Sequence, residues 1–170
     1  MRMHQRNSVL KVSHRAALRV ALLFVAVFLL PAVMALPAEA DMRRETLILE
    51  TKGARHVIDI EVADTLEEKA RGLMFRPKVP DNTGMLFPYG TPQEITMWMK
   101  NTYASLDMVF IRGDGIVHRI AANTEPLSER VIASEGDVTA VLELTAGAAM
   151  KLGLKPGDKV LHKVFGTQAK

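Results

Sequence analysis

The sequence predicts a mainly β fold, a compact β-barrel or sandwich of about eight short strands with two short helices. Apolar and polar residues alternate with a period of two in short segments, and Gly, Pro, Asn and Asp separate these segments. The segments also lie too close together for the long crossover helices that join parallel strands, which argues against a doubly wound sheet. We expect one β-rich domain over residues 41–170.

Residues 1–40 have the pattern of a secretory signal peptide. A basic segment comes first, an uninterrupted apolar run covers residues 20–30, and small residues end in Ala38-Glu39-Ala40. We therefore expect export to the periplasm with cleavage after Ala40, and Val33-Met34-Ala35 gives a second cleavage site. The alternative is a retained membrane anchor, because the 19 residues 20–38 are uncharged and just long enough to cross a bilayer. No Cys follows the apolar run, which excludes a lipid-anchored lipoprotein.

The charge balance of the domain differs from that of the whole chain. Of the 22 Lys and Arg and the 19 Asp and Glu, residues 1–40 hold five basic residues and one acidic residue, which leaves 17 basic and 18 acidic residues in the domain. The domain therefore has no basic excess with which to bind nucleic acid. The chain has no Cys, so disulfides and thiolate chemistry are excluded.

The N-terminal part of the domain predicts a hairpin followed by a short helix. Residues 46–51 and 56–63 alternate as strands, and Lys52-Gly53-Ala54 forms the turn between them. Asp64 or Thr65 can cap a helix that runs to about residue 73, because an acidic residue follows either of them three positions later.

The middle of the domain predicts further short strands. Residues 74–84 form a loop rich in turn-forming residues, and strands follow at residues 85–87 and 94–100 with a turn between them. A bend then leads to a buried strand at residues 106–112. Gly113-Asp114-Gly115 is a strong hairpin signal, so the next strand should pair back on this one.

The C-terminal part of the domain completes the set of elements. Residues 116–121 form the second strand of the hairpin, and after an irregular stretch residues 138–144 alternate as another strand. Residues 145–152 predict a helix of small residues that ends at Gly153. Residues 159–165 predict the last strand.

A cluster of polar residues marks the candidate site. Arg71, Lys100, Asn101, Asp107 and Glu143 lie at the ends or edges of apolar segments. Glu143 stands between two leucines within a strand, and Asp107 opens a strand. An unpaired buried carboxylate is very costly, so each needs a cation or several hydrogen-bond donors, and Lys100 and Arg71 are the obvious partners.

Two interpretations of this cluster are open. In the first, the cluster is a structural ion-pair network at the mouth of a barrel. In the second, it lines a ligand pocket in which Lys100 and Arg71 bind an anionic or polyhydroxyl group and Asn101 donates a hydrogen bond. Asp107 or Glu143 would then act as a general base.

Trp98, the only Trp in the chain, lies between Met97 and Met99. Strand alternation puts the two Met side chains on one face and Trp98 with Lys100 on the other. Two thioethers on one face are potential ligands for Cu(I), although Met also fills gaps in ordinary cores. Further Met candidates for such a site are Met74, Met85 and Met108. Trp98 itself is either a core aromatic or a stacking platform in a pocket.

Metal and cofactor motifs are missing from the sequence. The domain has His56, His118 and His162, and none of them has the spacing of a metal site. The sequence also lacks a Gly-rich phosphate loop, a G-x-S-x-G motif and an H-E-x-x-H motif. We therefore expect no metal and no cofactor.

Five sequence blocks together resemble a known family. The blocks are Arg71-Gly72-Leu73-Met74-Phe75-Arg76, Gly84-Met85-Leu86-Phe87, Trp98-Met99-Lys100-Asn101-Thr102, Leu106-Asp107 with the apolar run after it, and Val141-Leu142-Glu143-Leu144 followed by Ala146-Gly147. In this order they are similar to the blocks of domain-of-unknown-function family 192. The resemblance implies a small, mainly β exported domain with its core at residues 46–165, and it implies no particular activity. The blocks contain the polar cluster named above, together with Thr102.

The leading functional expectation is a periplasmic domain that binds a small ligand or an exported partner protein in a polar cleft beside Trp98. The expected ligand-binding residues are Trp98 and the five members of the polar cluster. The absence of a nucleophile constellation favours binding over catalysis. Contact with a membrane is expected only through residues 20–38, if the leader is retained.

Two alternative functions are open. The first is a hydrolase-like enzyme that uses Asp107 or Glu143 as base and Lys100 as electrostatic stabiliser. The second is a copper-handling protein that uses Met97 and Met99.

Overall fold

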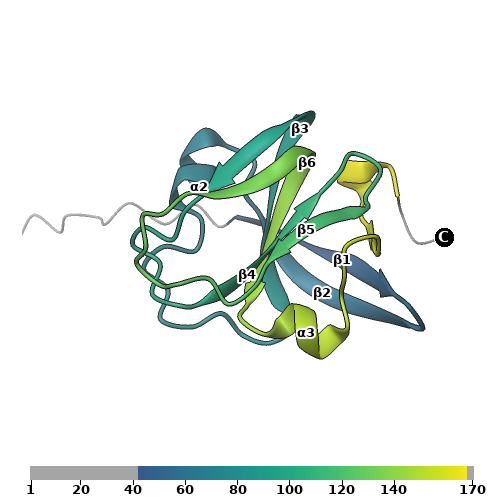
Figure 1. Cartoon of the computed structure of the whole chain (residues 1–170), viewed down its shortest axis with the longest axis horizontal. Coiled ribbons are helices and arrows are strands. Elements are labelled where there is room, and N and C mark those ends of the chain that lie inside the picture. Colours follow the sequence, from purple (N-terminus) through teal and green to yellow (C-terminus); the bar gives the residue numbers. More distant parts are fainter. Residues whose placement is uncertain (1–41, 168–170) are drawn as a thin grey trace, which may run out of the picture. The chain divides into compact units, whose positions relative to one another are not determined.

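The computed structural model describes residues 42–167, so the leader predicted for residues 1–40 lies outside the described part. The strands within it are β1 (Arg43–Thr51), β2 (Ala54–Val62), β3 (Thr83–Met97), β4 (Leu106–Ile111), β5 (Val117–Ala121), β6 (Ile132–Thr145) and β7 (Lys159–Leu161) (Figure 1). The helices are α2 (Leu66–Arg71), α3 (Ala148–Leu152) and a 3-10 helix (Lys163–Phe165). Among residues 42–167, no helix has both the length and the hydropathy that a membrane-spanning helix requires.

The strands form one seven-stranded sheet in the order β5-β4-β6-β3-β2-β1-β7. Neighbouring strands are antiparallel except β2 and β3, which are parallel. The two edges of the sheet meet at one end, where the Val117 N–H donates to the Asp158 carbonyl at 2.9 Å and the Val160 N–H donates to the Gly115 carbonyl at 2.7 Å. The sheet therefore curls into a partly closed barrel, which confirms the predicted mainly β fold (Figure 1).

The first hairpin and the capped helix form as the sequence predicts. β1 and β2 pair in register from Arg43 with Val62 to Thr51 with Ala54. The Thr65 hydroxyl accepts a hydrogen bond from the Glu68 N–H at 3.1 Å, and the Glu68 carboxylate accepts one from the Thr65 N–H at 2.7 Å. This capping box starts α2, which connects the parallel strands β2 and β3.

The predicted strands 85–87 and 94–100 are one strand in the structure, which corrects the expected number of strands from eight to seven. β3 continues past the predicted turn because β6 begins at Ile132 and pairs with β3 on both sides of that turn. The turn-forming residues are accommodated by a shift of register between Pro88 and Gln93. β3 ends at Met97, so Lys100 lies in the turn that follows and not in the strand.

The last helix and the last strand are shorter than predicted, whereas β6, at Ile132–Thr145, is longer than the predicted strand 138–144. β6 extends to Thr145, so α3 starts at Ala148, and it ends at Gly153, which has a φ of 70°. The predicted strand 159–165 is a short strand followed by the 3-10 helix. This helix begins where Nδ1 of His162 accepts a hydrogen bond from the Val164 N–H at 3.3 Å.

Two hydrophobic clusters occupy the two faces of the sheet. The first cluster includes Leu47, Leu49, Ile58, Val109, Ile111, Leu142 and Leu144. The second cluster includes Met85, Phe87, Met99, Met108, Phe110 and Val141. The central strands β4 and β6 contribute alternate residues to both clusters. The register between these strands therefore decides which face each of their polar side chains joins.

Candidate functional site

Glu143 is the polar residue at the centre of the candidate site. It lies on β6 between two neighbouring strands, in register with Met85 of β3 and with Met108 of β4. Both Met side chains are fully buried in the second cluster, and Glu143 itself is only 4% exposed. The two central strand pairings therefore place an ionisable carboxyl within an apolar face of the sheet.

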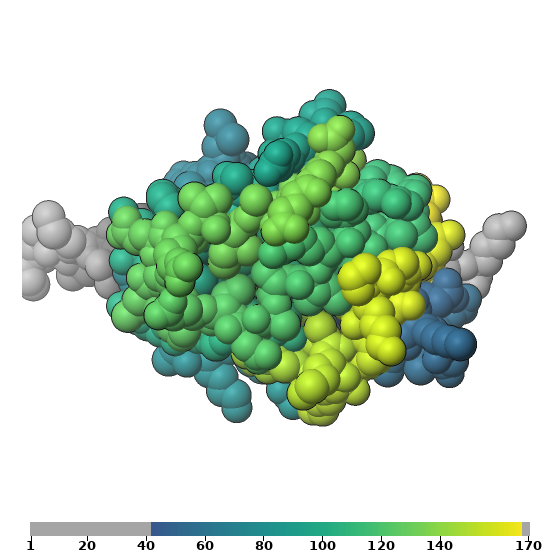
Figure 2. Space-filling model, in the orientation of Figure 1, coloured from purple at the N-terminus to yellow at the C-terminus, as the bar shows by residue number. Residues whose placement is uncertain are grey.

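A cavity of about 370 Å³ opens above Glu143. Its apolar and aromatic lining consists of Ala70, Leu73, Met74, Phe87, Tyr89, Met97, Trp98 and Val131. Its polar side chains are Lys69, Arg71, Thr96, Thr102 and Glu143. These residues come from α2 and the turn after it, from β3 and β6, and from the loops after β3 and β5. The last of these loops covers the left end of the visible face in the space-filling view (Figure 2). A volume near the lower limit of known ligand pockets is suited to a small molecule.

The Glu143 carboxyl faces the cavity without a hydrogen-bond partner. Every fully enclosed side-chain nitrogen or oxygen in residues 42–167 has a hydrogen-bond partner, and none of the side-chain hydrogen bonds or ion pairs within that range involves Glu143. The Glu143 oxygens are therefore not fully enclosed, and the adjoining open space is the cavity. A buried polar group in this state is rare, because losing hydration without a replacement hydrogen bond is costly.

The protonation state of Glu143 follows from this environment. Burial raises the pKa of the Glu143 carboxyl from 4.5 to about 8, so the side chain carries its proton at neutral pH. Burial also raises the pKa of Tyr89, and the nearby Glu143 carboxyl raises it further. At neutral pH the inner end of the cavity therefore offers an uncharged acid that can donate one hydrogen bond and accept another.

Gly72 closes the cavity over Glu143. Its backbone has φ 49° and ψ −134°, a conformation that residues with a Cβ rarely adopt. A Cβ at this position would lie 3.1 Å from the Phe87 ring and 3.9 Å from Oε2 of Glu143. The Arg71-Gly72-Leu73 segment thus needs glycine so that the backbone can approach the cavity floor.

Trp98 forms part of the cavity rim and is 49% exposed. The Lys100 ammonium lies 5.3 Å from the centroid of its ring and forms an ion pair with Glu129 at 3.5 Å. Lys100 is not among the residues that line the cavity, so it acts on the site through the position of Trp98. On α2, the Lys69 ammonium lies 5.3 Å from the ring centroid of Tyr89, which is itself a lining residue.

Asn101 supports the cavity wall from outside. It is exposed and has a φ of 54°, a left-handed conformation that Asn tolerates better than most residues. Its carbonyl accepts a hydrogen bond from the Phe75 N–H at 2.9 Å, and its side-chain Nδ2 lies 3.9 Å from the sulfur of Met74. Asn101 therefore ties the turn after α2 to the loop after β3.

Asp107 lies on the opposite face of the sheet from Glu143. It pairs with Leu144, whereas Glu143 pairs with Met108. Its carboxylate is fully buried and accepts hydrogen bonds from the N–H groups of Asn123, at 2.8 Å, and Ala149, at 2.9 Å. The expected pairing of Asp107 with Lys100 or Arg71 is therefore replaced by backbone donors. Asp107 connects the start of α3 to the segment after β5.

The structure brings together three of the six residues expected at the site. Arg71, Trp98 and Glu143 line the cavity, Lys100 and Asn101 support its rim, and Asp107 belongs to the first cluster's face. Sequence reasoning missed other lining residues, which are Lys69, Tyr89, Thr96 and Thr102. Tyr89 lay in the predicted turn and Thr96 lay within the predicted strand 94–100 without a signal of its own, while Thr102 carried a signal as a member of a family block.

The Met pair considered for copper does not share the cavity. Met97 lines it, and the Tyr89 hydroxyl lies 3.6 Å from the Met97 sulfur. Met99 is fully buried in the second cluster, and the Thr124 hydroxyl donates a hydrogen bond to its sulfur at 3.1 Å. In residues 42–167 there is no group of three or more His, Asp or Glu side chains that could hold a metal ion.

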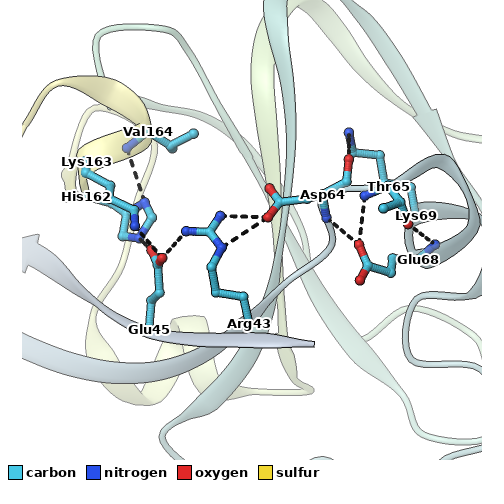
Figure 3. Close-up of polar contacts among 9 residues, drawn as sticks. All are labelled: Arg43, Glu45, Asp64, Thr65, Glu68, Lys69, His162, Lys163 and Val164. Carbon is cyan, nitrogen blue, oxygen red and sulfur yellow. Dashed lines mark hydrogen bonds and ion pairs between the residues drawn. The ribbon is translucent and has the colours of Figure 1, made fainter. Parts of the chain in front are cut away.

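A second polar network lies where the first and last strands meet (Figure 3). Nε2 of His162 and the Glu45 carboxylate are 2.8 Å apart, and Glu45 also contacts Arg43 and Lys163. Arg43 continues the network to Asp64 at 2.8 Å. Burial lowers the pKa of His162, an effect that Glu45 partly offsets. These charged groups have partners, so the network connects β1, β7 and the start of α2 without opening onto a ligand cavity.

Two other hollows on the surface each include an acidic side chain that forms an ion pair. One of about 110 Å³ includes Asp81, which forms an ion pair with Lys151 at 2.9 Å. Another of about 240 Å³ includes Glu61, which forms an ion pair with Arg76 at 2.5 Å. Neither has an unpartnered buried polar group like Glu143, which favours the larger cavity as the candidate site.

The fold and the site define a small β domain with a partly closed barrel and a buried acid in a lateral cavity. The chain belongs to domain-of-unknown-function family 192 (DUF192, "Uncharacterized ACR, COG1430"), whose model matches residues 47–162. This confirms the family that the sequence blocks resemble.

Two solved structures have a similar fold. A protein described as a "putative transcription regulator" from Sinorhizobium meliloti 1021 is 39% identical, with a TM-score of 0.72, and the match covers 74% of this chain and 98% of that one. A protein of unknown function from Novosphingobium aromaticivorans DSM 12444 is also 39% identical, with a TM-score of 0.70, and the match covers 74% of this chain and 89% of that one. No curated protein matches the chain.

Proposed function

We propose that this protein is an exported, periplasmic domain that binds a small ligand in the cavity between Glu143 and Trp98. The observation that carries the proposal is the buried Glu143 carboxyl, which faces a cavity and has no hydrogen-bond partner within the described residues. A ligand that hydrogen-bonds to this carboxyl would offset the cost of its burial. An unused polar group at the end of a mostly apolar pocket is typical of a binding site.

Each part of the cavity has a distinct role in this proposal. Glu143 orients the ligand from the inner end, while Phe87 and the Met side chains surround its apolar part. Trp98 provides an aromatic surface at the rim, and Arg71 provides a positive charge there. Lys100 and Asn101 hold the rim in place through Trp98 and Met74.

The proposal also covers where the protein is located and which partners it has. The basic, apolar and small-residue pattern of residues 1–40 supports export with cleavage after Ala40. A retained leader would be the only contact with a membrane. Nucleic acid is not a proposed partner, because the 17 basic and 18 acidic residues of residues 41–170 leave no basic excess.

Binding to another exported protein is the second form of the proposal. Phe75 and Tyr103 follow the lining residues Met74 and Thr102 in the chain, and they make an edge-to-face contact with ring centroids 6.1 Å apart. Both are about half exposed, as is Trp98. Such side chains are common where a partner chain docks.

Fluorescence provides a direct test of ligand binding, because Trp98 is the only Trp in the chain. A library of small molecules is titrated into the purified protein while Trp98 emission is recorded. At least one compound should shift the emission, and Glu143→Gln should weaken its binding. The matched control is Glu94→Gln, which changes an exposed carboxylate on β3 and should leave binding unchanged. If no compound shifts the emission, or if both variants bind like the wild type, the cavity is not the ligand site.

An enzyme is the alternative with specific support from the structure. A carboxyl whose pKa is about 8 is suited to general acid catalysis near neutral pH, so Glu143 could protonate a leaving group. Asp107 cannot share that substrate, because it lies on the other face of the sheet. The hydrolase-like alternative therefore rests on Glu143 alone. Turnover of a bound compound by the wild type that is lost in Glu143→Gln would favour catalysis over binding.

A further inference from the structure

The charged groups around the cavity are unevenly distributed. Of the described lining residues, Lys69 and Arg71 are basic and Glu143 is the one acidic residue. Lys69 lies against the Tyr89 ring and donates a hydrogen bond to the Asp64 carbonyl at 3.1 Å, which holds its ammonium at the edge of the cavity. The rim also has Lys100, whose charge is offset by Glu129.

The side chains at the inner end of the cavity are uncharged at neutral pH. The side chains in register with Glu143 on the adjacent strands are Met85 and Met108, and neither is charged. Tyr89 is the titratable group that faces Glu143 from β3, and its raised pKa keeps it neutral below pH 10. Glu143 is itself protonated at neutral pH. The cavity therefore has basic side chains among its lining residues and an acidic O–H at its inner end.

We infer that the ligand is a small anion with an apolar body, of the monocarboxylate class, whose oxygen accepts a hydrogen bond from the Glu143 carboxyl group. Lys69 and Arg71 lie at the cavity edge, where they stabilise the negative charge of the ligand. The Met and aromatic side chains contact its apolar body. This inference rests on the proposed function, because it names the chemical class of ligand for the same cavity.

An amine ligand would fit these groups less well. It would require Glu143 to ionise in an apolar surrounding, and it would place a second positive charge beside Lys69 and Arg71. The affinities of an anionic ligand and of an amine ligand should also change with pH in opposite directions. An anion binds the protonated form of Glu143, so its affinity falls as the pH rises through the pKa of about 8, whereas the affinity of a cation rises.

Three probes with the same chain length separate these ligand classes. Hexanoate, hexanamide and hexylamine are titrated into the purified protein at pH 7 and pH 9, with Trp98 emission as the readout. Hexanoate stays ionised and hexylamine stays protonated over this range. Hexanoate should bind most tightly at pH 7. Its affinity should fall about tenfold at pH 9, because the protonated fraction of Glu143 falls by that factor around a pKa of 8.

Variants identify the groups responsible for this pH dependence. In Glu143→Gln the tenfold change should disappear, because the amide does not titrate. In Lys69→Met the affinity for hexanoate should fall roughly two- to fivefold. The control Glu94→Gln should keep both the wild-type affinity and its pH dependence, because Glu94 is exposed and does not line the cavity.

The possible failures of this inference and of the proposed function are distinguishable. Tighter binding of hexylamine or hexanamide, or an affinity for hexanoate that rises with pH, overturns the anionic class while leaving a ligand-binding cavity in place. Absence of hexanoate binding at millimolar concentrations also overturns the inference. If the library titration likewise gives no ligand, the proposed function fails with it.

Discussion

Replacing Glu143 with Gln should change how the stability of the domain depends on pH. The folded wild-type protein keeps a proton on Glu143 up to a pKa of about 8, whereas the unfolded chain releases it near 4.5. Between these values the folded state binds more protons than the unfolded state. The free energy of unfolding should therefore fall as the pH rises from 4.5 to 8, and it should level off above that range.

The magnitude follows from the size of the shift. Each pKa unit corresponds to about 1.36 kcal/mol, so a change from 4.5 to about 8 costs the wild type about 5 kcal/mol of stability above pH 8. About 3.5 kcal/mol of this loss should occur between pH 5 and pH 8. Gln has nearly the same shape and does not titrate, so the variant lacks this loss.

The assay is urea denaturation of the wild type and of Glu143→Gln at intervals from pH 5 to pH 9. Other titrating groups are common to both proteins, so they cancel in the difference between the two free energies of unfolding. This difference should shift by about 3.5 kcal/mol in favour of the variant between pH 5 and pH 8. Glu94→Gln is the control, with an expected difference that is independent of pH over this range. A flat difference for Glu143→Gln would show that the carboxyl is hydrated or paired, and would refute the reasoning.

Three further substitutions test the parts of the structure that surround the cavity, each by urea denaturation. Gly72→Ala should lower the free energy of unfolding by about 1–3 kcal/mol. The backbone conformation of Gly72 is strained for a residue with a Cβ, and an added Cβ would lie 3.1 Å from the Phe87 ring. An unchanged stability would contradict this. Asp107→Asn should lower the free energy of unfolding by about 1–3 kcal/mol, because an amide cannot accept both backbone hydrogen bonds. The ligand affinity measured with Trp98 emission should stay unchanged in this variant. A loss of affinity without a loss of stability would show that Asp107 belongs to the site. Thr65→Ala should lose about 1 kcal/mol through removal of the helix cap, and Thr65→Ser should retain most of it.

Local features of the fold could be predicted because their signals lie within a few residues. The first hairpin needs only alternating strands around Gly53, which has a φ of 102°. The capping box of α2 needs only Thr65 and Glu68, three positions apart. The end of α3 at Gly153 also follows from one residue that tolerates a left-handed conformation.

The strand count could not be predicted in the same way. Residues 88–92 contain two Pro and one Gly, which favours a turn when they are considered alone. In the folded chain β6 runs beside this stretch from Ile132 to Thr145 and pairs with both of its ends. A partner strand distant in the sequence thus overrides the local preference. The same continuity places Tyr89, which also lines the cavity, within β3.

By itself, the sequence determined the mainly β class, the family and the absence of disulfides, since these depend on composition, local patterns and short blocks. Only the tertiary structure decided which of the polar residues act together. Asp107 and Glu143 carry the same chemical group, yet the register of β4 against β6 puts them on opposite faces of one sheet. Asp107 receives two backbone N–H groups there, and Glu143 receives none. A shift of one residue in the register of β4 against β6 would put both carboxyl groups on the same face, because side chains alternate along a strand, and register is a property of the assembled sheet.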